Sequence, residues 1–180
     1  MIKRHLLLVG APGCGKTTVA RRTAELLRDR GAEIFGFWTG EIRERGARIG
    51  FDIESLSGDR AIMAHVGFKG GPSVSKYGVD VEAVNRIAVA EIRRALREAR
   101  PAAILVIDEI GKMELFSAEF RDAVTTAIGG PLRVLATAMT KPHPFVDALK
   151  RRPDVETVAI TTTNRDRLPE LLAAELTKAS

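Results

Sequence analysis

The chain has 180 residues, of which 45% are hydrophobic and 28% charged, and its formal net charge is +5. This length suits one domain, or one domain with an insertion, and no apolar run approaches the roughly 20 residues of a membrane span. A single cysteine excludes an intrachain disulfide, and an aromatic content of 5% does not indicate nucleic-acid binding, which the basic charge still leaves open.

The N-terminal segment has the pattern of a strand, a glycine-rich turn and a helix. Leu6–Val9 is an apolar run, and a helical pattern follows from about Lys16 to Arg30, ending at Gly31. The turn between them reads GAPGCGKT over residues 10–17. Glycines let the backbone curl with its N–H groups pointing inward, and the helix adds its positive N-terminal end. The segment therefore predicts a phosphate-binding loop.

Each residue type in this loop has an expected role. Lys16 is expected to bridge the β- and γ-phosphates, and the Thr17 hydroxyl to bind Mg²⁺. Cys14 is expected to act through its backbone, the alternative being a redox-sensitive thiol. A cleaved signal peptide would destroy the loop, so we expect a cytoplasmic protein. The residues expected to bind nucleotide here are Gly10, Ala11, Pro12, Gly13, Cys14, Gly15, Lys16, Thr17 and Thr18.

The pattern of residue types changes after the first predicted helix. Residues 33–39 read as a strand, and residues 41–53 alternate polar and apolar around Arg45-Gly46, which predicts a β-hairpin. Residues 61–66 fit a short strand and residues 67–78 a loop. Residues 39–78 therefore predict an antiparallel insertion within a single domain spanning 1–180.

Strands and helices alternate in the remainder. Asp80 is expected to cap a long helix that ends at Pro101, with Glu91 on its solvent face. Ser117 is expected to cap the next helix. The other expected elements are strands at 102–108, 132–136 and 155–160 and a final helix around 168–176. The alternation predicts right-handed crossovers and an α/β fold with a doubly wound, mostly parallel sheet.

Two carboxylates end the buried strand at 102–108. A parallel strand delivers its last side chains to the edge of the sheet where ligands bind. Asp108 is placed to hold Mg²⁺ opposite Thr17, and Glu109 to orient or deprotonate a water for attack on the γ-phosphate. Gly111 and Lys112 follow and are also expected to bind nucleotide, with the alternative that Lys112 caps a turn.

Several stretches together resemble one family. They are GAPGCGKTT at 10–18, FGFWTGEIRERGARIGFDI at 35–53, KYGVD at 76–80, DEIGKMEL at 108–115 and TNRDRLP at 163–169. They are similar to the cancer-related (thermophile-type) nucleoside-triphosphatase family of P-loop NTPases. The resemblance implies a RecA-like or kinase-like P-loop fold and Mg²⁺-dependent hydrolysis of ATP, GTP and other nucleoside triphosphates. It also implies the phosphate role for 10–17 and the metal and water roles for Asp108 and Glu109.

For the other candidate residues the sequence allows either a functional or a structural role. Arg43, Arg45 and Arg48 either stabilise charge at the γ-phosphate or are simply solvated. Asn164 either contacts the base or caps the last helix. The basic residues at 141–152 form either a mobile lid or, as favoured here, a surface loop. The three histidines His5, His65 and His143 lack partners at ligand spacing, and none is expected to bind metal.

Three functions follow from these features. The first is a slow, monomeric nucleoside triphosphatase.

 It would act on a broad range of bases with Mg²⁺ as cofactor. The second is a nucleoside or nucleotide kinase, in which residues 39–78 form the site of a phosphate acceptor. The third is a nucleotide switch whose partner is RNA or another protein, which the basic charge favours. The sequence does not distinguish water from a second substrate as the group that meets the γ-phosphate.

Overall fold

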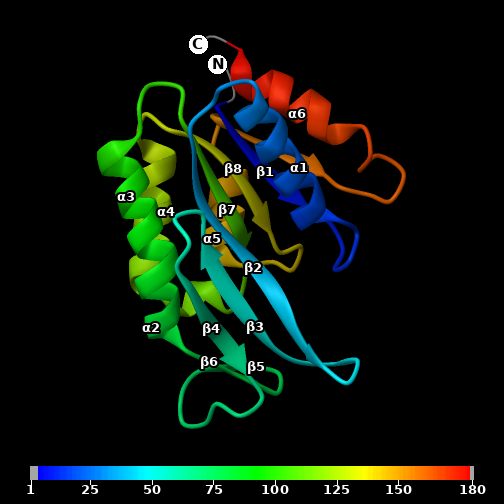
Figure 1. Ribbon diagram of the computed structural model, residues 1–180, viewed down its shortest axis with the longest axis vertical. Coiled ribbons are helices and arrows are strands. Elements are labelled where there is room, and N and C mark those ends of the chain that lie inside the picture. The colour runs from blue at the N-terminus through cyan, green and yellow to red at the C-terminus, as the bar shows by residue number, and fades with distance from the viewer. Residues whose placement is uncertain (1–3, 179–180) are drawn as a thin grey trace.

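The computed structural model describes residues 4–178, which form one nine-stranded sheet flanked by helices (Figure 1). The strand order is β5-β6-β4-β3-β2-β7-β8-β1-β9. Strands β2, β7, β8, β1 and β9 pair in parallel, as expected from their apolar runs. Their bounds are β1 His5–Val9, β2 Ile34–Glu44, β7 Ile104–Ile110, β8 Arg133–Ala138 and β9 Val155–Ala159.

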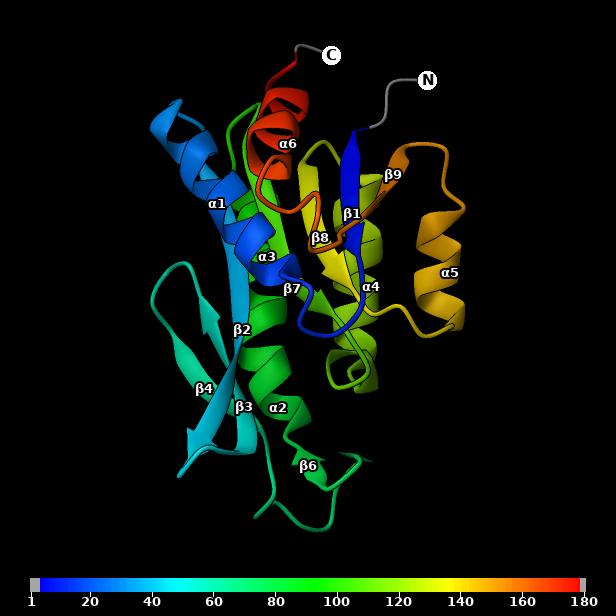
Figure 2. The same ribbon diagram turned by 90° about the vertical axis from the view of Figure 1, so that its right-hand side faces the viewer.

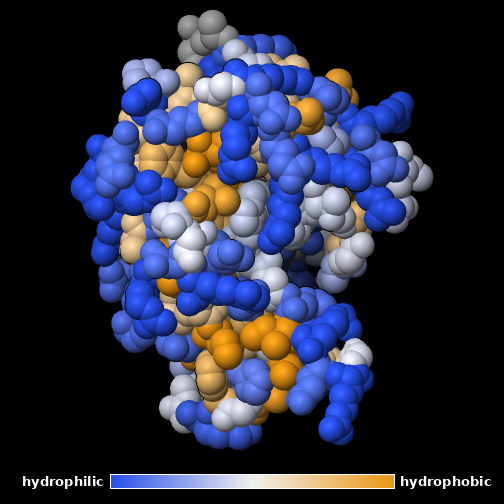
Figure 3. Space-filling view, in the orientation of Figure 1, coloured by the Kyte–Doolittle hydropathy of each residue, from blue (hydrophilic) through white to orange (hydrophobic). Residues whose placement is uncertain are grey.

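Strands from the segment 39–78 extend this sheet with antiparallel pairing. They are β3 Ala47–Ser55, β4 Arg60–His65, β5 Ser73–Val74 and β6 Tyr77–Val79. The predicted hairpin turn is confirmed, with Arg45 and Gly46 at φ 48° and 81°. The expected loop at 67–78 is wrong in part, because Ser75 takes a φ of 55° and folds β5 back onto β6. Apolar side chains gather over β3 and β4 on the face seen in Figure 3.

Helices cover both faces of the sheet (Figure 2). On one face α1, Lys16–Asp29, packs beside α6, Leu168–Thr177. The other face is covered by α2 Val81–Val84, a π-helical segment Asn85–Val89, α3 Ala90–Glu98, α4 Ala118–Gly129 and α5 Pro144–Lys150. Asp80 and Ser117 accept the capping hydrogen bonds predicted for them, from the N–H groups of Ala83 and Phe120. The α/β prediction is therefore confirmed.

Helix α5 lies where the sequence predicted a surface loop. His143 accepts a hydrogen bond from the Phe145 N–H at the start of this helix, and Pro144 follows it in the first turn. Proline fits the first turn because its missing N–H has no partner there in any helix. Val146 and Leu149 then bury their side chains in the core. The loop prediction failed because the helix is short and its few apolar residues stand between basic residues that are typical of an exposed loop.

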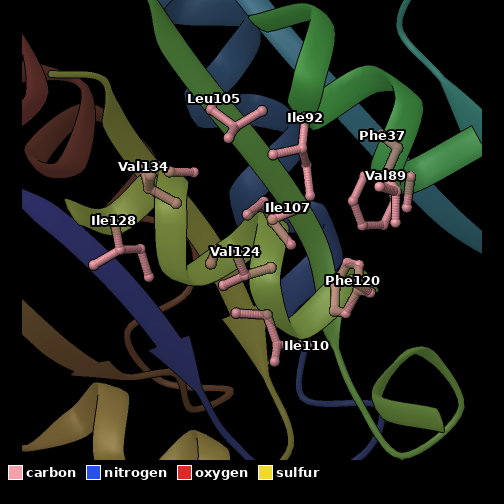
Figure 4. Close-up of a cluster of buried hydrophobic side chains, with 14 of the residues drawn as sticks. Phe37, Val89, Ile92, Leu105, Ile107, Ile110, Phe120, Val124, Ile128 and Val134 are labelled. Atoms are coloured by element: carbon pink, nitrogen blue, oxygen red, sulfur yellow. The ribbon is translucent and has the colours of Figure 1, made fainter. Parts of the chain in front are cut away.

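The larger core lies between the sheet and helices α3 and α4 (Figure 4). Phe37 and Phe120 meet there edge to face, with ring centroids 6.1 Å apart. Both are fully buried, so both side chains pack in the core. Apolar side chains from β7, including Leu105 and Ile107, complete this cluster. The core thus fixes β7, whose C-terminal end carries Asp108 and Glu109.

Glu91 is buried, although its helical position predicted a solvent-facing side chain. Its carboxylate accepts hydrogen bonds from the Gly36 N–H, at 3.1 Å, and from Arg94. It also accepts one from the Ser57 hydroxyl. A side chain at Gly36 would collide with Val106, since a Cβ there would lie 2.0 Å from the Val106 carbonyl oxygen. The buried carboxylate therefore ties α3 to β2 at the point where Gly36 lies against Val106 of β7.

His5 gives an expected pH dependence of stability. Burial lowers the pKa of His5 to about 4, although Asp154 acts in the opposite direction. Between pH 6.5 and 4 the unfolded chain takes up a proton that the folded chain does not. The free energy of unfolding therefore decreases as the pH is lowered through this range. We expect this residue to remove about 2 kcal/mol of unfolding free energy between pH 7 and 5. Urea unfolding at the two pH values measures it.

The matched variant is His5→Leu, which cannot take up the proton. Its unfolding free energy should fall less between pH 7 and 5 than that of the parent chain. An equal fall in both proteins would show that other groups cause the acid sensitivity.

Candidate active site

The loop at 10–17 takes a conformation that its glycines make possible. Gly13 and Gly15 have φ values of 77° and 106°, in the region that favours glycine. Gly10 is needed for a different reason, because a Cβ there would lie 2.5 Å from Cys14 Sγ and 2.6 Å from the Ile160 carbonyl oxygen. The Cys14 side chain is buried in the apolar cluster beneath α1. This packing fits a backbone role for Cys14 in the loop.

Gly10→Ala tests the tight packing behind the loop. We expect it to destabilise the chain by about 1–3 kcal/mol, because the added methyl group collides with backbone as well as with a side chain. Thermal unfolding measures the loss. Gly129→Ala in α4 is the matched control, since a Cβ there meets no atom within 4 Å. Equal stability of the two variants would contradict the packing argument.

Lys16 joins the loop to β7. Its Nζ atom donates a hydrogen bond to the Gly10 carbonyl oxygen at 3.0 Å and lies 4.0 Å from Glu109 Oε2. The lysine side chain is 11% exposed, whereas that of Glu109 is 33% exposed. Burial raises the pKa of Glu109, the Lys16 cation opposes this rise, and the Asp108 charge adds to it. The structure thus brings the two predicted catalytic side chains together at one edge of the sheet.

Asp108 is fully buried beside the start of α1. Its Oδ1 atom accepts hydrogen bonds from the hydroxyls of Thr17, at 3.1 Å, and Thr137, at 2.5 Å. Burial raises the pKa of Asp108, and these two hydrogen bonds oppose the rise. Its Oδ2 atom is buried and has no hydrogen-bond partner among residues 4–178. A buried carboxylate oxygen without a partner is costly, so this atom is suited to a ligand.

The residues around Asp108 fit a magnesium ion. Carboxylate and hydroxyl oxygens are its preferred protein ligands, and it commonly uses one or two carboxylates together with substrate phosphates. Asp108 and Thr17 supply oxygens of both kinds at the edge of the phosphate loop. Within the described residues no group of three or more His, Cys, Asp or Glu side chains forms a metal cage. Asp108 and Thr17 are the residues that could hold such an ion, with substrate phosphates as its further ligands.

Thr137 is a site residue that the sequence reasoning missed. It lies in β8, which runs between β1 and β7 and so reaches Asp108 directly. Its side chain is fully buried, and the other residues of the strand after Arg133 are apolar. A hydroxyl in such a strand needs a partner. That requirement was the available signal, although the sequence does not give the strand order that identifies the partner.

A cavity of about 290 Å³ opens beside the loop, lined by Gly15, Thr18, Val19, Arg22, Arg165 and Asp166. Asn164 holds the segment that forms one of its walls. Its side chain accepts a hydrogen bond from the Thr161 N–H at 2.9 Å and donates one to the Ala159 carbonyl at 2.8 Å. Arg167, and not Asn164, occupies the residue before α6. The cap interpretation of Asn164 is therefore wrong, and its neighbour Arg165 faces the cavity.

The hairpin arginines make contacts of their own. Arg43 and Arg48 each lie 2.6 Å from Glu41, and Arg48 also donates to the Tyr77 hydroxyl. Arg45 lies exposed at the turn. Among the described residues, no recorded hydrogen bond or ion pair joins these arginines to the loop at 10–17. Lys112 is exposed, while the Gly111 N–H donates to Glu114.

The site combines a glycine-rich loop between a strand and a helix with a lysine and a threonine that face a buried aspartate on a second strand. This combination defines a P-loop NTPase. The chain matches the family model described as NTPase over residues 5–173, and it belongs to this family. The predicted fold and the predicted nucleoside-triphosphatase class are therefore confirmed. Neither the kinase nor the switch alternative is favoured by these findings.

Relatives match over nearly the whole chain. The nucleoside-triphosphatase THEP1 of Natranaerobius thermophilus is 43% identical over 98% of each chain. The human cancer-related nucleoside-triphosphatase is 38% identical over 92% of each. The crystal structure of THEP1 from Aquifex aeolicus superposes with a TM-score of 0.88 at 35% identity, covering 97% of this chain and 99% of that one. Across residues 4–178, no helix has the length and apolar character needed to cross a membrane.

Proposed function

We propose that this chain hydrolyses nucleoside triphosphates to diphosphate and phosphate, with Glu109 directing the attacking water. The observation that carries the proposal is the 4.0 Å approach of Glu109 Oε2 to Lys16 Nζ. Lysine in this loop binds the β- and γ-phosphates, so the γ-phosphate would lie beside the Glu109 carboxylate. A carboxylate in that position can accept a proton from water during in-line attack.

Mg²⁺ is the cofactor that the oxygens of Asp108 and Thr17 would hold. Bound there with the phosphates, it supplies positive charge that neutralises the developing negative charge. Lys16 holds the phosphate chain and orients the γ-phosphate. Thr137 keeps the Asp108 carboxylate in place through its hydrogen bond to Oδ1. These assignments are supported by the donor types and by the partnerless Oδ2 atom of Asp108.

The nucleoside would occupy the cavity bounded by Arg22 and Arg165. Its lining presents two guanidinium groups and one carboxylate. Guanidinium planes stack on aromatic rings of any kind, which supports a broad range of bases.

P-loop hydrolases that lack a supplied arginine turn over at about 10⁻⁴ to 10⁻² per second, and we expect a rate in this range. One domain with an insertion at 39–78, a monomeric state and a cytoplasmic location stay predictions.

Phosphate release from the four common nucleoside triphosphates tests this function. We expect release with each of them in the presence of Mg²⁺, and at least a tenfold loss when EDTA removes the ion, because phosphate charge is then not neutralised. Adding Mg²⁺ back should restore the rate. Equal release in EDTA would contradict the metal assignment. Transfer of labelled γ-phosphate to an added nucleoside or nucleoside monophosphate would contradict hydrolysis.

A further inference from the structure

Glu114 is a buried acid next to the site that has no role in the chemistry described above. It begins the 3₁₀ turn Glu114–Phe116, which follows β7. The residue is only 3% exposed. Its Oε2 atom accepts a hydrogen bond from the Gly111 N–H at 3.1 Å. A side chain of this type is almost never fully buried without a specific reason.

The carboxyl groups of Glu114 and Glu109 flank the same point of the backbone. A Cβ built on Gly111 would lie 2.8 Å from Glu114 Oε2 and 2.9 Å from Glu109 Oε1. Glycine therefore leaves the space in which the two carboxyl groups approach each other. The turn between them is closed by a second hydrogen bond, from the Leu115 N–H to the Gly111 carbonyl. The position of Glu109 is thus linked to the contacts of Glu114.

The charges around Glu114 are mainly negative. Glu109 and Asp108 face it from β7. The guanidinium of Arg121 on α4 donates its hydrogen bond to the Leu115 carbonyl oxygen and not to Glu114. The remaining charged groups on adjoining elements are exposed, namely Lys112 in the turn, Glu82 on α2, and Glu119 and Asp122 on α4. Within residues 4–178 Glu114 makes no ion pair. Burial, together with the charges of Glu109 and Asp108, raises the pKa of Glu114 to about 8.

We propose that Glu114 is a positioning residue for Glu109 and that it acts as a neutral acid. In this form it accepts the Gly111 N–H and holds the turn without adding a second negative charge beside Glu109. Loss of its proton would place repulsive charge next to both Glu109 and the triphosphate. The inference rests on the proposed role of Glu109 in directing water.

Glu114→Ala and Glu114→Gln test the proposal in steady-state phosphate release. The alanine variant should lose about 10- to 100-fold in kcat, with KM changed by less than about threefold, because only the orientation of Glu109 is disturbed. The glutamine variant should recover most of this loss, because a neutral amide oxygen can accept the same N–H. Full kcat in the alanine variant, or equal loss in both variants, would overturn the proposal.

The pH profile separates a neutral acid from a merely structural side chain. In the parent chain kcat should fall about tenfold per pH unit above pH 8, as one proton is lost. In Glu114→Gln this alkaline fall should be absent, and an unchanged fall would overturn the proposal even if the alanine variant does not fold. Glu109→Gln measured in parallel keeps the two claims apart. Full turnover in that variant would refute the role of Glu109, whatever Glu114 does.

Discussion

Glu109→Gln is expected to lower kcat by about 10²- to 10⁴-fold, the usual contribution of a positioned general base. Glutamine has nearly the same shape but cannot accept the proton from water. Nucleotide binding should change little, because the Lys16 contact with the phosphates remains. Single-turnover phosphate release measures the chemical step, and a fluorescent triphosphate measures binding.

Glu25→Gln is the matched control for this substitution. Glu25 lies exposed on α1, away from the carboxylates of β7. Its turnover should equal that of the parent chain. If Glu109→Gln loses binding and turnover equally, Glu109 is a structural partner of Lys16 and does not direct water.

Lys16→Ala is expected to weaken triphosphate binding by about 10- to 100-fold, the loss typical of a charged hydrogen bond. The affinity for the diphosphate should decrease less, because that ligand has no γ-phosphate for Lys16 to contact. Calorimetric titration of both nucleotides measures the difference. Lys69→Ala, at an exposed lysine in the loop after β4, is the control. Equal weakening of the two nucleotides would contradict contact between Lys16 and the γ-phosphate.

The phosphate loop and the carboxylates could be found in the sequence because each lies in one continuous segment. The order strand, glycine turn, Lys16 and helix is local, and β7 is recognisable from its apolar run before Asp108. The same reasoning applies to the hairpin, whose turn at Arg45-Gly46 is set by neighbouring residues. Local patterns thus identified most of the sheet and the phosphate end of the site.

The missed features depend on contacts between distant segments. Thr137 reaches Asp108 because β8 runs between β1 and β7, an order that no local pattern specifies. Glu91 looked solvent-facing on its helix, yet the Gly36 N–H gives its carboxylate a buried partner. Glu114 is buried only because the turn after β7 folds back. Polar residues at ambiguous positions were therefore the hardest to interpret.

Strand β2 has a mechanical consequence. It runs as one strand from Ile34 to Glu44, pairing with β7 along its first part and with β3 along the rest, with one register shift between Ile42 and Arg43. At about 3.3 Å per residue it forms a continuous arm that carries the hairpin outward from the site. Such an arm is preformed and cannot fold over the nucleotide as a hinged flap would. A molecule that binds to the hairpin would meet a fixed template and lose little affinity to ordering it.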